Sequence, residues 1–371
     1  MMGSHIRRSL LTWAPLLAII AVSVMLRITL VLRGGQHYWP DEARFARPET
    51  LWWMLQQGEL ESAWLMLLTK VDHTGFILVG LPAVIIRSTV AAGWGLSSVG
   101  TIWVAALVLS MASVMAIGLV YAVARRAGAS HTEALLATLL MACATSMLYY
   151  GRHFLPYDSA IALLLLALWV GLGRTTRLAL SFICGLIVGM AFLTYNGYWL
   201  TGAIVLLIHV AYRQRVLVAM VTRALAAGTG LVTLPLLLTI ASIQAGEKPY
   251  ILALLSFAET SKQGVHSEGW SLPWEYLWHV EHTLLLVWGI ALLITLGLTF
   301  TRSPLLEKRA LLWLAAALGI YALLVVRSTV FEMFVPNGRS ARQVVPFLCL
   351  MTAASLYALW SHRPRSRRRE R

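Results

Sequence analysis

Long, nearly uninterrupted apolar runs constrain this chain more than any other feature of its sequence. Each run is about 20 residues long, which is enough for a helix to cross a hydrocarbon core of roughly 30 Å. Backbone polar groups inside a bilayer must be satisfied internally, so continuous runs of this kind cross as helices. The candidate helices cover 9–32, 75–92, 98–123, 132–150, 159–173, 178–194, 198–212, 216–240, 283–300, 310–326 and 343–361. The sequence therefore predicts an all-α, polytopic transmembrane helix bundle that forms one integral membrane domain over residues 1–371.

The composition agrees with this prediction. Hydrophobic residues make up 59% of the chain and charged residues only 12%, whereas soluble domains have about 25% charged residues. A net charge of +14 would indicate nucleic acid as a partner of a soluble protein. Here the basic residues gather in short loops and in the tail 362–371, the pattern of loops that set membrane orientation. We therefore expect membrane lipids, and no nucleic acid, as partners.

The loop charges also indicate which runs cross the membrane. Cytoplasmic loops carry an excess of Lys and Arg, and Arg7 and Arg8 precede the first run. The later basic loops and the tail lie on the cytoplasmic side, together with Arg7 and Arg8, only if 75–92 lies along the outer surface while the other runs cross. This predicts about ten spans in the cell membrane, cytoplasmic termini, and juxtamembrane helices anchored by Trp in the first outer loop, 33–97. A second large outer loop covers 241–282.

Two adjacent carboxylates, Asp41 and Glu42, follow Pro40 in the first outer loop. Proline followed by acidic residues is typical of a helix start, but a carboxylate is also the usual general base for activating a hydroxyl. Asp158 stands at the outer start of the run 159–173, where it can cap a helix. Because Asp41 and Asp158 are expected on one side of the membrane, they can also share a site, with or without a divalent metal ion.

Basic residues on the outer side indicate an anion. Arg339 and Arg342 stand three residues apart, so they share one helix face. They either snorkel to lipid head groups or bind an anion, for which a phosphate is the natural choice. Arg27 lies inside the first run, where an ionisable residue usually faces protein or a polar cavity. His73 opens the predicted surface hairpin, where a lone histidine is more often a satisfied loop residue.

A second set of metal-ligating side chains, Glu275, His279 and His282, falls at helical spacing in the second outer loop. They either form a metal-ligand face or the wet side of a helix lying on the membrane. The sequence contains no P-loop, G-x-S-x-G, C-x-x-C or H-E-x-x-H motif. ATPases, common serine hydrolases and zincin proteases therefore have no motif in their favour.

Several short motifs follow one another along residues 1–230. They are Arg27 late in the first run, Asp41-Glu42-Ala43-Arg44-Phe45-Ala46, His73-Thr74-Gly75, Ala124-Arg125-Arg126, the turn Gly151 to Asp158, and a Gly-rich run from Gly185 to Thr194. This order resembles the GT-C superfamily of membrane glycosyltransferases. It is most similar to the group that contains protein O-mannosyltransferases and the aminoarabinose transferases of lipid A, the glycosyltransferase family 39-like enzymes.

The resemblance implies transfer of a sugar from a polyprenyl-phosphate carrier to an acceptor on the extracytoplasmic side, with inversion at the anomeric carbon. By this resemblance Asp41 is the base, and Glu42 and Asp158 orient the acceptor or hold a divalent ion. Arg339, Arg342 and Arg152 neutralise the leaving phosphate, an electrostatic role that is often the largest catalytic contribution. His73 is a substrate-binding residue. The acceptor, whether lipid, glycan or protein hydroxyl, stays open.

Three other interpretations remain at this point. A flippase or transporter of a lipid-linked saccharide is favoured by Arg27 in a span, although transporters often show paired repeats and no repeat is visible. A ligase or polymerase of the O-antigen kind would use outer arginines and a large late loop, for which 241–282 is a modest candidate. A purely structural membrane subunit is the third.

Overall fold

A computed structural model of the chain describes residues 2–34, 40–97, 99–173, 177–261, 271–301, 308–330 and 340–361. Every regular element in these ranges is a helix, which confirms the all-α prediction. Within these ranges, seven helices are long and apolar enough to cross a membrane. They are α1 (Met2–Arg33), α4 (Thr74–Trp94), α5 (Ile102–Arg126), α11 (Leu217–Gln244), α14 (His282–Phe300), α15 (Lys308–Thr329) and η4 (Arg342–Val344) continued by α17 (Val345–Ser361).

The expected count of about ten spans is not confirmed, because several apolar helices are shorter than the roughly 20 residues that a span needs. These are α6 (His131–Cys143), α8 (Tyr157–Gly171), α9 (Leu178–Thr194), and η3 (Asn196–Tyr198) with α10 (Trp199–Ala211). The predicted run 132–150 breaks at Ala144, whose backbone is extended. There the buried carboxylate of Glu281 accepts hydrogen bonds from the N–H groups of Thr145 (2.9 Å) and Ser146 (2.8 Å). A carboxylate at this position stabilises a new helix N-terminus, and α7 (Thr145–Tyr150) starts there.

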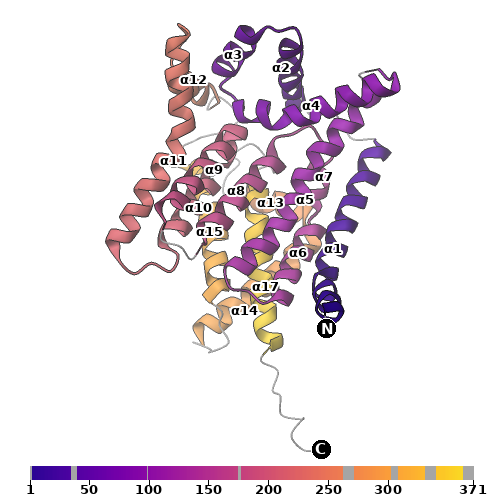
Figure 1. The fold of residues 1–371 in the computed structure, drawn as a ribbon. Helices are drawn as coiled ribbons and strands as arrows, with labels where there is room; N and C mark the ends of the chain where they lie inside the picture. Colours follow the sequence, from indigo (N-terminus) through magenta and orange to yellow (C-terminus); the bar gives the residue numbers. More distant parts are fainter. Residues whose placement is uncertain are drawn as a thin grey trace, which may run out of the picture.

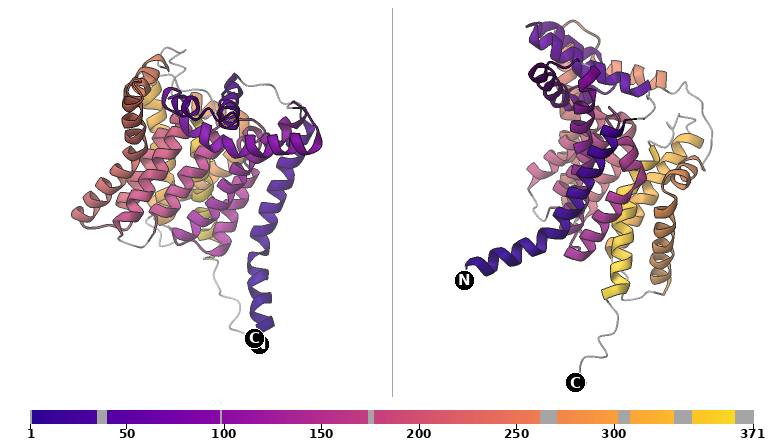
Figure 2. Two further views of the ribbon diagram at one scale, coloured as in Figure 1. Left: turned by 45° about the horizontal axis from the view of Figure 1, so that its top comes forward. Right: turned by 90° about the vertical axis from the view of Figure 1, so that its right-hand side faces the viewer.

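A layer of helices lies across one end of the bundle. It is formed by η1 (Pro40–Phe45), α2 (Ala46–Gln56), α3 (Leu60–Thr69) and α4. Figure 1 shows α4 running crosswise over the ends of the upright helices, and the views in Figure 2 agree. α4 packs on α2, α5 and α9. Its length and composition would allow a span, but its direction is the one that the charge argument predicts for residues 75–92.

Glycines bring the helices of the bundle into close contact. A Cβ on Gly185 would lie 1.9 Å from the carbonyl oxygen of Ala227, and one on Gly230 would lie 2.0 Å from that of Phe182. α9 and α11 therefore cross backbone against backbone, as small residues allow in membrane helix pairs. Gly75 allows a similarly close contact between the crosswise layer and the bundle, because a Cβ at this position would lie 2.6 Å from the backbone nitrogen of Thr194. This contact holds the start of α4 against the end of α9.

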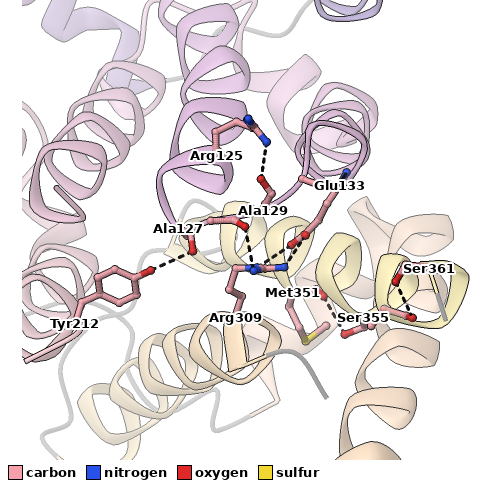
Figure 3. Close-up of polar contacts among 12 residues, drawn as sticks. Arg125, Ala127, Ala129, Glu133, Tyr212, Arg309, Met351, Ser355 and Ser361 are labelled. Atoms are coloured by element: carbon pink, nitrogen blue, oxygen red, sulfur yellow. Dashed lines mark hydrogen bonds and ion pairs between the residues drawn. The ribbon is translucent and has the colours of Figure 1, made fainter. Parts of the chain in front are cut away.

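The two ends of the bundle are different. We call the end beneath α2–α4 the covered end, and the opposite end, where α1 starts and α17 finishes, the basic end (Figures 1 and 2). Figure 3 shows the basic end around Arg309 and Glu133. The Arg309 guanidinium donates to both Glu133 oxygens, at 3.3 and 2.9 Å, and to the carbonyl of Gly128 at 3.1 Å. These bonds fasten the start of α15 to the turn between α5 and α6.

Two further short helices complete the described chain. α12 (Tyr250–Ser261) follows α11, and α13 (Leu272–Val280) leads into α14. The Tyr250 hydroxyl lies 2.7 Å from Thr74 Oγ1, so α12 is tied to the start of α4. The predicted second outer loop, 241–282, therefore contains two helices, as its Pro249 and Pro273 starts indicate, with residues 262–270 outside the described chain.

Candidate functional site

Asp41 lies in the first turn of η1, directly after Pro40, so the helix-start interpretation describes its backbone. Its side chain is 15% exposed and is held by two groups. The Tyr157 hydroxyl donates to Oδ2 at 2.8 Å, and Arg44 lies 3.0 Å from Oδ1. Asp41 is therefore an oriented carboxylate at the covered end that still reaches solvent.

Glu42 points the other way and is buried. One of its oxygens accepts from the Phe154 N–H at 3.1 Å and lies 3.0 Å from His153 Nδ1. These contacts join η1 to the turn between α7 and α8. Glu42 thus positions its neighbour Asp41 over that turn. This is a structural contact, whereas the resemblance implies that Glu42 orients the acceptor or holds a divalent ion.

Asp158 is buried at the start of α8 and pairs with the wholly buried Arg342 of η4. Arg342 Nη2 also lies 3.1 Å from the Met147 sulfur, and the guanidinium carbon is 4.6 Å from the centre of the Tyr150 ring. Within the part of the chain that the structure describes, Arg342 Nε and Nη1 have no hydrogen-bond partner. Because buried polar groups are nearly always bonded, these two N–H directions indicate a missing acceptor.

Arg27 of α1 is a second wholly buried guanidinium in this region. Nη1 donates to the Ser23 carbonyl at 3.0 Å and Nη2 to Ser113 Oγ at 2.6 Å. Its Nε has no partner among the described residues. The place that a Cβ of Gly151 would take is 3.7 Å from this Nε and 3.6 Å from Asp158 Oδ2. Arg27 therefore belongs to one buried cluster with Asp158 and Arg342.

Charge in this cluster does not balance. Two guanidinium groups, Arg27 and Arg342, face one carboxylate, Asp158, so the described ionic groups leave one positive charge. A buried uncompensated charge is costly unless it is paired. A bound anion would balance it, whereas a divalent cation beside Asp158 would meet two like charges.

Tyrosines from four segments surround the cluster, and sequence reasoning missed them. The buried rings of Tyr150, Tyr157, Tyr195 and Tyr198 follow one another at centroid distances of 5.6, 4.6 and 4.8 Å. Tyr276 of α13 also reaches Tyr150. Burial raises the pKa of the Tyr195 and Tyr276 phenols, so both stay protonated at neutral pH. The sequence signal that could have identified these tyrosines is that they all lie at the predicted outer ends of apolar runs.

His73 caps α4 in a left-handed conformation, with φ at 66°. It is buried and stacks on Tyr195 with a centroid distance of 5.2 Å. Neither ring nitrogen makes a hydrogen bond of good geometry among the described residues, although the backbone of Asp72 lies close enough to interact with the ring. Burial lowers the pKa of His73 well below its usual value, and the positive Arg44 and Arg47 lower it further. The imidazole is therefore neutral at pH 7, so one ring nitrogen can donate a hydrogen bond and the other can accept one.

Other predicted residues lie elsewhere. Arg152 is half-buried, with its guanidinium carbon 5.6 Å from the Tyr149 ring centre. Arg339 lies outside the described residues. Glu275, His279 and His282 are exposed at α13 and the start of α14. No cluster of three or more His, Cys, Asp or Glu side chains suited to a metal ion occurs in the described ranges.

Two apolar grooves in the bundle have lining residues near the cluster. The first, which we call the α14–α15 groove, has a volume of about 190 Å³ and is lined from α13, α14, α15, η4 and α17. Its lining includes Val344, two residues beyond Arg342, and Leu277, next to Tyr276. The second, the α10–α11 groove, has a volume of about 360 Å³ and includes Tyr198 in its lining. Both grooves therefore end beside the tyrosines that enclose the cluster.

Comparison with known proteins adds no assignment. No protein-family model matches the chain, and no curated protein matches it. The functional argument therefore depends on the site itself.

Proposed function

We propose that this chain is a membrane glycosyltransferase that moves a sugar from a polyprenyl-phosphate carrier to an acceptor hydroxyl. The observation that carries the proposal is the wholly buried Arg342 guanidinium, whose Nε and Nη1 have no hydrogen-bond partner among the described residues, two residues before Val344 in the lining of the α14–α15 groove. A phosphate ester with a long apolar chain fits both features. Guanidinium groups bind phosphate oxygens through two parallel hydrogen bonds, and the chain can lie in the α14–α15 groove.

The residues of the covered end provide the remaining parts of such a reaction. Asp41 takes the proton of the acceptor hydroxyl, whose oxygen then bonds to the anomeric carbon. The bond between that carbon and the phosphate oxygen breaks, and the electron pair leaves with the polyprenyl phosphate. Arg342, with Arg27 behind it, stabilises the charge that develops on the leaving phosphate. His73 lies near Arg44, which pairs with Asp41, and offers a neutral ring to a sugar hydroxyl.

In this proposal Asp158 keeps Arg342 in place and is not a metal ligand. We place the site on the extracytoplasmic side because the charge pattern predicts cytoplasmic termini, and the covered end is opposite the end where α1 starts. No step of the proposed transfer uses a metal ion, although a divalent ion near the partly exposed Asp41 stays open.

Translocation of a lipid-linked saccharide is the second candidate, and Arg27 favours it. A wholly buried guanidinium inside a candidate span is a common feature of transport pathways. Against it, the carboxylate with solvent access, Asp41, lies in η1 and outside the bundle helices. Transfer needs such a group, whereas translocation does not.

The test uses proteoliposomes with a panel of radiolabelled polyprenyl-phosphate hexoses and pentoses added to the outside, together with a lipid extract as acceptor. Wild-type protein should release polyprenyl phosphate and label the extract. Asp41→Asn should lower the rate by about 100-fold or more, the scale of general-base catalysis. Movement of label across the bilayer without product would instead identify a flippase.

A matched control is available in the same layer. Asp72 is paired with Arg47 at 2.8 Å and its side chain is 19% exposed, close to the values for Asp41 and Arg44. Asp72→Asn should keep wild-type turnover. If Asp41→Asn is as active as Asp72→Asn in folded protein, the base assignment is wrong.

A further inference from the structure

Two consecutive residues at the start of α8 connect the two functional halves of the site. Tyr157 bonds to Asp41 of η1, and Asp158 pairs with Arg342 of η4. Successive residues of a helix point about 100° apart, because one turn takes 3.6 residues. One turn of backbone therefore reaches both the carboxylate and the guanidinium, which come from opposite ends of the sequence.

The Tyr157 ring has little freedom to move. It is 1% exposed and lies against Tyr150, Tyr195 and Tyr198, at centroid distances of 5.6, 4.6 and 6.4 Å. Its hydroxyl donates to Asp41 Oδ2 at 2.8 Å. A donor fixed in this way selects one rotamer of the carboxylate and stabilises its ionised form.

We propose that Tyr157 is the positioning residue of the transfer reaction: its hydroxyl orients Asp41, and its backbone sets the separation between Asp41 and the Arg342–Asp158 pair. The inference depends on the proposed function, since it assigns Tyr157 a role toward the proposed base. Tyr157 itself takes no proton and does not touch the reacting atoms. It acts only through Asp41.

The pH dependence of the reaction should report this role. The groups that face Asp41 or its phenol partner are Arg44 on η1, Tyr157 on α8, and Tyr150, Tyr195 and Tyr198 on the segments packed around that phenol. His73 also lies within electrostatic range of Arg44. Removing the Tyr157 hydroxyl takes a hydrogen bond from the ionised carboxylate and leaves Arg44 as its charged partner.

The experiment compares Tyr157→Phe with wild type and with Tyr121→Phe, using whichever labelled polyprenyl-phosphate sugar the wild type accepts. Tyr121 is a matched control, because its hydroxyl lies 2.8 Å from His131 Nδ1 outside the site and it is similarly buried. Tyr157→Phe should lower kcat by about 10- to 100-fold, leave the donor KM unchanged, and move the acid limb of the rate profile up by about one pH unit. Tyr121→Phe should change none of these.

The outcomes separate the inference from the proposed function. If Asp41→Asn is inactive while Tyr157→Phe keeps the wild-type kcat and pH profile, the positioning role is wrong and the transferase stands. A lower rate with an unshifted pH profile, in proportion to lost folded protein in a thermal unfolding assay, also overturns it, because that is a packing effect. If Asp41→Asn itself keeps activity, the proposed function fails first.

Discussion

Arg309 at the basic end and Arg342 at the covered end are the same residue type, each paired with a carboxylate from another helix. Every hydrogen-bonding nitrogen of Arg309 has a protein acceptor, two on Glu133 and one on Gly128, and its side chain is 20% exposed (Figure 3). Arg342 is wholly buried, yet its Nε and Nη1 are unpartnered among the described residues.

The difference distinguishes a structural ion pair from a candidate binding site. Partial exposure and complete hydrogen bonding reduce the desolvation cost of a guanidinium that only joins loops. A guanidinium that is buried with open N–H groups is costly to the fold, and a ligand that satisfies those groups is the physical reason to keep it. Neighbouring Arg27 repeats the pattern with its unpartnered Nε.

Removing each arginine should give the largest contrast. Arg342→Met breaks the buried ion pair with Asp158 and leaves Arg27 as the nearest cation, so we expect a loss of about 3–5 kcal/mol in unfolding free energy. Arg309 is 20% exposed but Glu133 is only 3% exposed, so Arg309→Met leaves a carboxylate near the edge of the protein, and we expect a smaller loss of about 1–3 kcal/mol. Thermal or denaturant unfolding in detergent measures both. Equal losses would show that the two arginines have the same structural role.

A ligand should stabilise only one end. Polyprenyl phosphate at 100 times its Kd should raise the unfolding free energy of wild type and of Arg309→Met by about 2.7 kcal/mol. The double variant Arg342→Met with Asp158→Leu replaces the whole buried pair, which is often tolerated by the fold. It should show no stabilisation by the lipid. A response equal to that of wild type would place the phosphate elsewhere.

Single hydrogen bonds at the two ends should also differ. Ser113→Ala removes the acceptor of Arg27 Nη2, a bond to a buried charge, and should destabilise the protein by about 2 kcal/mol. Tyr212→Phe removes a neutral bond to the Ala127 carbonyl at the basic end and should lower the unfolding free energy by about 1 kcal/mol. The unfolding assay compares them directly. A larger effect at Tyr212 would contradict the account of a buried cluster with an uncompensated positive charge.

The last expected effect concerns the pH dependence of stability. His73 is neutral in the folded state because burial lowers its pKa, while in the unfolded chain it titrates near about 6.5. The unfolded state therefore binds more protons below that pH, and stability should fall with decreasing pH by up to about 1.4 kcal/mol per unit from this residue. His73→Asn tolerates the left-handed backbone and should flatten the slope between pH 6.5 and 5. An unchanged slope would mean that His73 is protonated in the folded protein.

The sequence predicts the outline of the site better than its interior. Outer-loop carboxylates and a late arginine could be grouped from charge and topology alone, and the structure brings Asp41, Asp158 and Arg342 into one region. The loop charges predict that residues 75–92 lie along the surface, and α4 does run crosswise to the upright helices (Figure 1), although its length and composition would also allow a span. The predicted run 132–150 divides where Glu281 starts a new helix at Thr145, and the sequence pattern could not show this because that contact joins residues 136 positions apart.

The tyrosine shell was missed for a similar reason. Tyr150 and Tyr157 flank the turn between α7 and α8, whereas Tyr195 and Tyr198 lie between α9 and α10, and their rings meet only in the folded chain. Aromatic residues at the ends of apolar runs usually anchor helices at the membrane interface. The sequence pattern therefore could not distinguish tyrosines buried around a site from tyrosines that face the lipid head groups. The burial of His73 was also missed, because it depends on tertiary packing: the neighbouring Gly75 lies against the end of α9.

The most direct test of the central claim is a cryo-EM structure of the chain in nanodiscs that contain polyprenyl phosphate. We predict phosphate density within about 3 Å of Arg342 Nη1 or Nε, with the apolar chain in the α14–α15 groove. Phosphate bound away from Arg342, or an Arg342 whose open N–H groups are satisfied by the protein alone, would contradict it.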